Sequence, residues 1–448
     1  MTAVLEQRTA RAGWLLVATT ASGAVNYAYA VVLTHGLTPA QYASFAAGQA
    51  LIVVAAVVCA AGLPWAVARE IAQHDRADVV SFALVAGLGV GAALALPLAA
   101  LELAIGTAGD AAVVAISCLI LATGSTVLGY FQGRGRMATI ALLLTAETVV
   151  KAGIGLALAF GTSLGATGAL LGFACGGLVL LSPLPALRHL LRRPAWQPDL
   201  LRAAVQQTRL QVTVAVVGAG DTVLVGLLGL AGGPYQAASA LCRVPLFAAN
   251  ALATATFPQL ARDGAASGRA AALRSYLLVG ILAAGGLGTL PDEIRGLLFP
   301  SSFDDVDRWL PCTAVLGLAL GALNLGVMFL QAGDPRGRTA GGLAAIAAGY
   351  LGTMAAAGSA FAVGGLAAGA AVGGLLTVGA ITAFPAVRDG ALLLVRSRRA
   401  RRELAGVLLA VCALAMTTDL LLWLAVAAVA GYAVLRVAFP ELWPGGRR

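Results

Sequence analysis

Residues 36–48 read GLTPAQYASFAAG and residues 229–241 read GLAGGPYQAASAL, with the glycine, leucine and tyrosine in register at an offset of 193. Two further pairs follow in the same order: REIAQHDR at 69–76 with PQLARDGA at 258–265, and YFQGRGR at 130–136 with FLQAGDPRGR at 329–338. In the last pair, Ser125 and Asn324 each lie seven positions before the glutamine. A shared order at a nearly constant offset indicates two homologous halves.

The composition is that of a protein that crosses a membrane many times. Of 448 residues, 60% are hydrophobic and only 11% are charged, unlike a soluble globular domain. A bilayer core of roughly 30 Å needs about 20 apolar residues per helix. We therefore expect an all-α polytopic membrane protein with about 14 transmembrane helices, near residues 13–34, 43–66, 79–101, 111–133, 138–161, 164–186, 208–230, 236–258, 273–291, 309–332, 339–360, 363–385, 404–417 and 420–438. The last two are separated only by Thr417, Thr418 and Asp419, which leaves one long interfacial and spanning helix as an alternative.

The basic residues give the orientation. With the N-terminus in the cytoplasm, only Arg295 and Arg308 fall in outer loops and only Lys151 and Arg243 fall within spans, out of 29 lysine and arginine residues. Cytoplasmic loops of membrane proteins are enriched in these residues. We therefore expect both termini in the cytoplasm of a multi-pass plasma-membrane protein. The net charge of +9 follows from this bias and calls for no nucleic-acid partner.

The repeat predicts how the chain is divided. Six spans per half is an even number, so both halves insert the same way round, related by an axis along the membrane normal. We expect two pseudo-symmetric six-helix bundles around a central cavity, followed by a C-terminal helix pair. The expected parts are an N-terminal bundle at 1–187, a basic cytoplasmic linker at 188–207, a C-terminal bundle at 208–386, a basic cytoplasmic loop at 387–403, and the helix pair with a short tail at 404–448.

Four stretches carry a resemblance to a known family: YAYAVVLTHGLTPAQYASFAAGQAL from Tyr27, LPWAVAREIAQHD from Leu63, LGYFQGRGRM from Leu128 and IRGLLFPSSFDDVDRWLPCTAVLGLAL from Ile294. Together they resemble the polysaccharide or O-antigen (lipid-linked oligosaccharide) flippases of the multidrug/oligosaccharidyl-lipid/polysaccharide exporter superfamily, over essentially the whole chain. The resemblance implies alternating access. It also implies that an undecaprenyl-pyrophosphate-linked oligosaccharide moves from the cytoplasmic to the outer leaflet for polysaccharide biosynthesis, with the polyprenyl tail remaining in lipid.

A cavity for sugars and pyrophosphate needs polar and cationic side chains. In span 236–258, Ser239, Arg243, Asn250 and Thr254 follow spacings of 4, 7 and 4, which on a continuous helix gives one polar stripe. In the first span, Ser22, Asn26 and Tyr29 continue a similar stripe from Thr19. Polar packing between helices is the alternative for both stripes, although arginine is costly in that role.

Two pairs of opposite charge lie within predicted spans. Asp221 and Arg243 lie about 14 and 10 Å below the outer ends of consecutive spans, so they could pair. Either they only neutralise each other, or Arg243 is shared with an incoming phosphate or sugar acid.

The second charge pair is Glu147 with Lys151, the only lysine of the chain. Their spacing brings them together on one helix face, about 14 Å deep in the membrane. Mutual neutralisation by proton transfer is one interpretation. The other is that they line the cavity and bind the headgroup or take part in proton-coupled gating, because a buried ammonium can lose its proton and a guanidinium cannot.

No nucleotide loop, metal-ligand spacing or nucleophile with a base partner stands out, so we expect a transporter rather than an enzyme, with no cofactor. The expected partners are a lipid-linked oligosaccharide of the polyprenyl-phosphate type, membrane lipids, and glycosyltransferases or a polymerase of the same pathway.

Three alternatives remain open. The first is a proton- or sodium-coupled multidrug antiporter of the same superfamily, for which a carboxylate near the first span is expected and absent here. The second is a non-transporting membrane scaffold for glycan assembly. The third, a flippase of the peptidoglycan precursor, would carry several arginines in N-terminal spans that here hold none.

Overall fold

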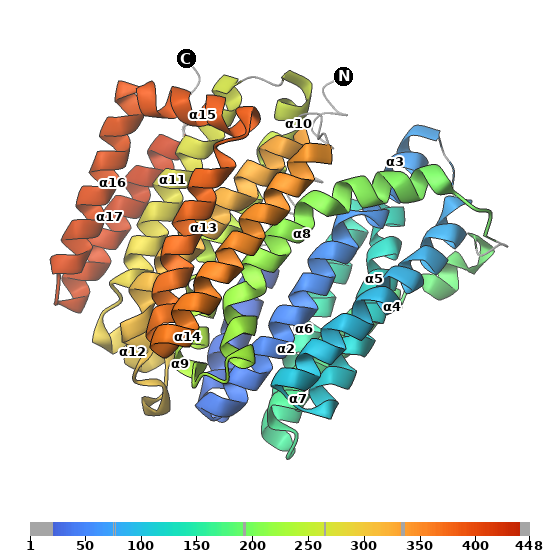
Figure 1. Cartoon of the computed structure of the whole chain (residues 1–448), viewed down its shortest axis with the longest axis horizontal. Helices are drawn as coiled ribbons and strands as arrows, with labels where there is room; N and C mark the ends of the chain where they lie inside the picture. The colour runs from blue at the N-terminus through green and yellow to red at the C-terminus, as the bar shows by residue number, and fades with distance from the viewer. Residues whose placement is uncertain are drawn as a thin grey trace. The chain divides into compact units, whose positions relative to one another are not determined.

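The computed structural model describes residues 21–74, 76, 78–190, 194–263, 266–332 and 337–439. Over these ranges the chain is helical and contains no β-strand, as the sequence predicts. The chain forms two compact units, Met1–Ala231 and Gly232–Arg448 (Figure 1).

The described part of the first unit opens with helical residues 21–36. It continues with α2 (Pro39–Ala61), α3 (Leu63–His74), α4 (Val79–Ile105), α5 (Ala108–Gly133), α6 (Met137–Gly161), α7 (Gly165–Leu181), the 3-10 turn η1 (Leu184–Leu190) and α8 (Pro198–Leu227). Local sequence explains where α2 starts. Thr38 and Gln41 form a reciprocal capping box, and Pro39 occupies the first helical turn, where a missing N–H costs nothing.

Helix α8 corrects two boundaries expected from the sequence. It starts at Pro198, so residues 198–207 are helical rather than part of a linker. It packs along α2 and also contacts α3, which places it in the first unit. The compact units divide after Ala231. The division into two six-helix halves joined at 188–207 remains a prediction.

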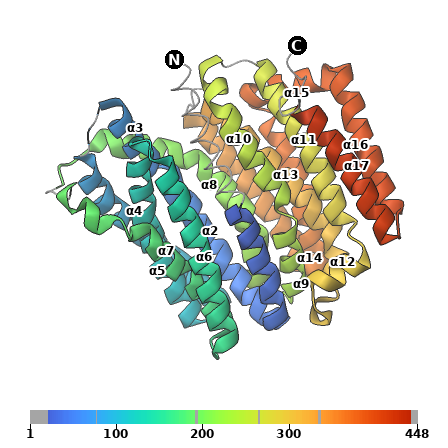
Figure 2. The ribbon, with the colours of Figure 1, turned by 180° about the vertical axis from the view of Figure 1, so that it is seen from behind.

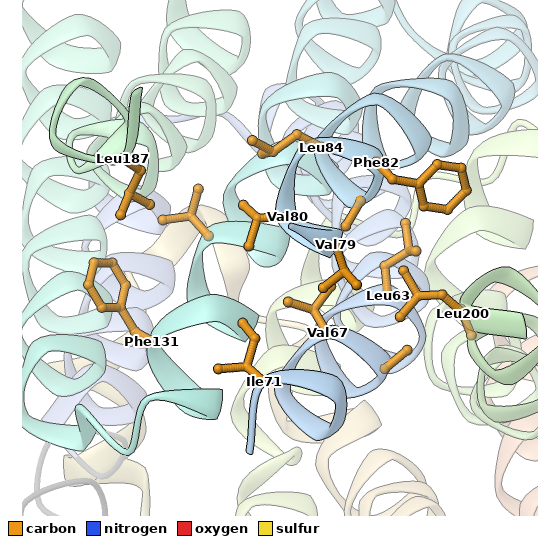
Figure 3. Close-up of a cluster of buried hydrophobic side chains, with 14 of the residues drawn as sticks. Leu63, Val67, Ile71, Val79, Val80, Phe82, Leu84, Phe131, Leu187 and Leu200 are labelled. Carbon is orange, nitrogen blue, oxygen red and sulfur yellow. The ribbon is translucent and has the colours of Figure 1, made fainter. Parts of the chain in front are cut away.

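The predicted span 43–66 is also corrected, because the helix bends at Gly62. A side-chain carbon at Gly62 would lie 2.3 Å from Thr208 Oγ1 and 2.9 Å from the Ala204 carbonyl oxygen of α8. Only glycine permits this close approach. Beyond the bend, α3 packs its apolar face, including Val67 and Ile71, onto α5 and the start of α4 (Figure 3). Leu63 and Leu200 of α8 belong to the same cluster.

The second unit contains α9 (Gly233–Leu241), α10 (Val244–Asp263), α11 (Ala266–Gly288), α12 (Asp292–Leu298), the 3-10 turn η2 (Ser301–Phe303), α13 (Val306–Ala332), α14 (Gly337–Ile381), α15 (Pro385–Arg396), α16 (Arg398–Met416) and α17 (Leu420–Ala438). Helix α13 is the core of this unit, with α9, α10, α11 and α14 packed around it. It has the largest buried share of all candidate spans in the described ranges.

The end of the chain resolves one open alternative and corrects one expectation. Helices α16 and α17 are separate and lie side by side (Figures 1 and 2), with Asp419 accepting a hydrogen bond from the Leu422 N–H at the start of α17. The predicted helix pair is therefore confirmed, and the single long helix is excluded. The predicted basic loop 387–403 is instead mostly helical, because α15 and the start of α16 occupy it.

Nine helices in the described ranges are long and apolar enough to cross a membrane. Helix α14 counts once among them, although Phe361 and Ala362 are non-helical and divide it where spans 339–360 and 363–385 were expected to meet. The chain is thus an all-helical multi-pass membrane protein, for which about fourteen spans is an approximate number.

The repeated glutamine motif occupies equivalent places in both units. Ser125 on α5 donates a hydrogen bond to the Cys59 carbonyl of α2 (3.2 Å). Asn324 on α13 donates to the Asn250 side chain of α10 (2.7 Å). Ser125 thus connects α5 to α2, which contains Tyr42 of the first GL…Y motif. Asn324 connects α13 to α10, which follows the second GL…Y motif in α9. Similar connections are expected if the halves are homologous.

The contact between α11 and α16 should depend on pH. Burial opposes ionisation of Glu403, but hydrogen bonds from Arg274 and from Arg399 (2.9 Å) hold its pKa below the ordinary value. A lowered pKa stabilises the fold above the unfolded-state value of about 4.5, and this contribution is lost as pH falls through the folded-state pKa. Glu403→Gln should therefore lower the melting temperature at pH 7 and have little effect in acid. An equal loss at both pH values would contradict this assignment.

Candidate functional site

The predicted span 236–258 is not a continuous helix. Helix α9 ends at Leu241, Cys242 and Arg243 form a turn, and α10 begins at Val244. Pro245 is the physical reason, because proline has no N–H to donate and its ring collides with the carbonyl four residues earlier, that of Leu241. The spacing of Ser239, Arg243, Asn250 and Thr254 therefore does not define one helix face, and the predicted stripe on a single straight helix is wrong.

The break is packed against α13. A side-chain carbon at Gly317 would lie 1.8 Å from the Cys242 carbonyl oxygen, so α13 can approach only with glycine there. The Cys242 thiol donates to the Leu310 carbonyl (3.7 Å), and the Leu246 N–H donates to the Arg243 carbonyl (3.0 Å). Non-helical backbone at membrane depth is tolerated when protein buries it in this way.

The residues of the predicted stripe lie in different surroundings. Ser239 is buried in α9, Arg243 is half-buried at the break, and Asn250 accepts the hydrogen bond from Asn324. The side chain of Thr254 lies outside the described residues. Asn324 is a contact that the stripe alone did not predict; its signal was its place in the glutamine repeat.

In the first helix, Tyr29 is a packing residue in this conformation. It is 2% exposed, donates a hydrogen bond to the Ala169 carbonyl of α7 (2.7 Å), and lies edge-on to Phe45. Gly155 of α6 makes room for its hydroxyl. Ser22 and Asn26 are half-buried, and Thr19 lies outside the described residues.

The predicted meeting of Glu147 and Lys151 is confirmed. Lys151 Nζ lies 3.6 Å from Glu147 Oε1, and their side chains are 7% and 16% exposed. Thr148 donates to the other Glu147 oxygen (3.1 Å), and the ammonium lies over the Phe173 ring at 4.8 Å. Phe173 also packs near Tyr29, with ring centroids 6.3 Å apart. The aromatic ring thus connects a charge pair on α6 with the first helix.

Close packing of α6 on α7 holds this pair in place. A side-chain carbon at Gly176 would lie 2.7 Å from the Glu147 carbonyl oxygen and 2.8 Å from Lys151 Cβ, and one at Gly172 would lie 2.5 Å from the Lys151 carbonyl oxygen. The glycines of α7 therefore allow the backbones to approach closely, as is usual for helices packed in membranes.

Asp221 is fully buried in α8 and accepts a hydrogen bond from the neighbouring Thr222 (3.3 Å). It belongs to the first compact unit and Arg243 to the second. Their pairing remains a prediction.

Residues 9–262 match the family described as "Polysaccharide biosynthesis protein". The chain belongs to this family. No curated protein sequence matches the chain.

Solved structures give the fold of this family member. It is similar to "Lipid II flippase MurJ, inward closed conformation", with a TM-score of 0.72 at 14% identity over 96% of this chain and 99% of that one. An inward-facing multidrug resistance MATE transporter of the MOP superfamily gives a TM-score of 0.56 at 12% identity over 84% and 96% of the two chains. The eukaryotic MATE transporter AtDTX14 gives 0.56 at 14% identity over 90% and 99%. The chain therefore has the fold of these transporters.

The charge pair on α6 predicts a double-mutant result. Lys151→Met should leave Glu147 buried and unpaired and cost about 3–5 kcal/mol of stability, because removing one partner of a buried pair strands the other charge. Adding Glu147→Gln should recover much of that loss. Thermal unfolding of the purified protein in detergent measures both. Additive losses in the double variant would show that the two side chains do not interact.

The close packing of Gly317 against the break at Arg243 predicts that position 317 does not tolerate a side chain. Gly317→Ala should destabilise the protein by about 1–3 kcal/mol, because its new carbon meets a backbone carbonyl that has no freedom to move away. Gly349→Ala on α14 is the matched control, since nothing lies within 4 Å of that position. It should be neutral or stabilising, by up to about 1 kcal/mol, through helix propensity. Equal melting temperatures for the two variants would contradict the packing described.

Proposed function

We propose that this protein is a flippase that moves an undecaprenyl-pyrophosphate-linked oligosaccharide from the cytoplasmic to the outer leaflet by alternating access. The observation that carries the proposal is membership of the polysaccharide biosynthesis family combined with a fold similar, over 96% of the chain, to that of a lipid II flippase. A transporter fold of this kind suits the movement of a lipid-linked oligosaccharide. Sugars and a pyrophosphate need a polar path, whereas the polyprenyl tail can stay in the bilayer.

Arg243 is the residue that we assign to the phosphate groups. It immediately precedes α10 and so lies at the positive end of that helix dipole. A guanidinium can bind phosphate oxygens with two parallel hydrogen bonds. Interrupted helices in transporters place such termini at substrate sites. In our proposal Asp221 holds Arg243 in the empty state, and the phosphate competes with it. Ser239, Asn250 and Thr254 then contact the sugars.

The N-terminal half would contribute Glu147 and Lys151, together with Ser22, Asn26 and Tyr29. Lys151 is covered by Phe173 in this conformation, so contact with a headgroup requires the ring or the first helix to move. In our proposal this movement is part of gating, and Lys151 reaches the headgroup only after it. We assign the protein to the plasma membrane with both termini in the cytoplasm, following the distribution of arginine. Glycosyltransferases or a polymerase of the same pathway are its expected protein partners.

A second function is supported by the similarity to MATE transporters. In a proton- or sodium-coupled multidrug antiporter, Glu147 would be the ion-binding carboxylate. Depletion of the protein in its native cell separates the two functions. Radiolabelled lipid-linked glycan should accumulate on the cytoplasmic leaflet, with uptake of a cationic dye unchanged. Unchanged lipid intermediates with raised dye retention would instead identify an antiporter. If neither changes, neither transport function is supported.

Arg243 gives the sharpest test of the assigned site. Arg243→Gln should slow flipping by about 10- to 100-fold, the value of a charge-assisted hydrogen bond of about 1.5–3 kcal/mol. Arg243→Lys should retain part of the rate because it keeps the charge. Arg202→Gln is the matched control, since that side chain is 69% exposed and pairs with Asp199 at the surface. Normal flipping by Arg243→Gln at wild-type protein levels would remove Arg243 from the site.

A further inference from the structure

A fully buried carboxyl group lies beside the turn between α4 and α5. Glu102, in the last turn of α4, is 0% exposed. Neither of its carboxyl oxygens has a hydrogen-bond partner in the described part of the chain. Buried polar groups are almost always hydrogen-bonded, and a buried charge without a partner is very costly. Something must therefore neutralise Glu102 in the folded protein.

The neighbouring Asp110 is in the opposite situation. It is 1% exposed, yet four donors serve it: the Ser44 hydroxyl of α2 (3.1 Å), the Thr107 hydroxyl (2.9 Å) and N–H (3.2 Å), and the Thr167 hydroxyl of α7 (2.6 Å). It also lies in the first turn of α5, at the positive end of the helix dipole. These donors stabilise Asp110 as a carboxylate.

The two carboxyl groups border one small space. A side-chain carbon at Gly106 would lie 2.7 Å from Glu102 Oε1, 3.2 Å from Asp110 Oδ2 and 3.4 Å from Ser44 Oγ. Three oxygens from three helices thus surround a point that glycine leaves open. A side-chain carbon at Gly48 of α2 would lie 3.2 Å from the same Glu102 oxygen.

The charges around this space leave one negative charge unmatched. Asp110 is compensated by its donors, but Glu102 lies near the negative end of α4. Of the helices packed on α4, α5 brings Asp110 and α2 brings Ser44 to this end. Helix α8 touches Ile105 at Gly226 and carries Asp221 five residues earlier. Helix α3 packs at the other end of α4, where its titratable residues Arg69, Glu70 and His74 lie. Among the described residues, none of these helices gives Glu102 a basic partner.

We propose that Glu102 and Asp110 form a binding site for one monovalent cation, a proton or Na⁺, with Ser44 as a further oxygen ligand. The carboxylate of Glu102 carries one negative charge without a counter-charge, so one positive charge neutralises it. Oxygen ligands suit a hard cation. The bound cation holds the ends of α4 and α5 against α2, on the side that we expect to face outward. The site does not depend on the proposed flippase activity.

Thermal unfolding of the purified full-length protein tests the site without a transport assay. Melting temperature is measured from pH 6 to pH 9, with NaCl replaced stepwise by choline chloride at constant ionic strength. A ligand that binds only the folded state raises stability with its concentration. If Na⁺ binds, the melting temperature rises with NaCl, most strongly at high pH. If a proton binds, the melting temperature falls as pH rises, whatever the NaCl concentration.

Two variants assign the effect to Glu102. Glu102→Gln should lose the dependence that the wild type shows, because a neutral amide needs no cation. Glu293→Gln, an exposed glutamate in α12, should retain it. If Glu102→Gln does not fold, Glu102→Asp, which keeps the carboxyl group but moves it, should shift the midpoint of the NaCl or pH dependence. A wild type that responds to neither ion, or a Glu102 variant with the wild-type midpoint, overturns the proposal.

Discussion

The hydrogen-bonding requirement of the backbone in lipid governs this structure. A peptide group in the bilayer core has no water to bond, so each segment must satisfy its own N–H and carbonyl groups as a helix. Departures from helix need cover from protein. Two departures within the apolar segments, at Gly62 and at Cys242–Arg243, each have a neighbouring helix packed against them. In both places glycine, at Gly62 or at Gly317, makes the contact close enough.

The same environment determines how charge is arranged. Glu147 and Lys151 face each other, and Phe173 covers the ammonium. Asp110 draws on hydroxyl groups from two other helices and its own cap, whereas Glu102 beside it receives no hydrogen bond from the described residues. Arg243 lies at the break between α9 and α10, which α13 covers. Interrupted helices of this kind are where transporters place substrate sites.

Much of the architecture follows from sequence alone, because apolar length and arginine distribution are strong signals in membrane proteins. The i, i+4 spacing also predicted the contact between Glu147 and Lys151. The break at Arg243 does not follow from hydropathy, because the apolar run continues through it; Pro245 is the signal that the sequence contains. Glu102 could not have been found this way. A glutamate near a span end resembles an interfacial residue, and only the packing of α2, α5 and α7 around the turn buries it.

Transport of a lipid-linked glycan can be measured in proteoliposomes, with an undecaprenyl-pyrophosphate-linked oligosaccharide whose sugars are cleaved or labelled only on the accessible leaflet. We expect the purified protein to make the inner pool accessible at a rate that increases with the number of protein copies per vesicle. If the inner pool stays equally protected with and without folded protein, over a range of pH and Na⁺ gradients, the protein is not a flippase for this lipid.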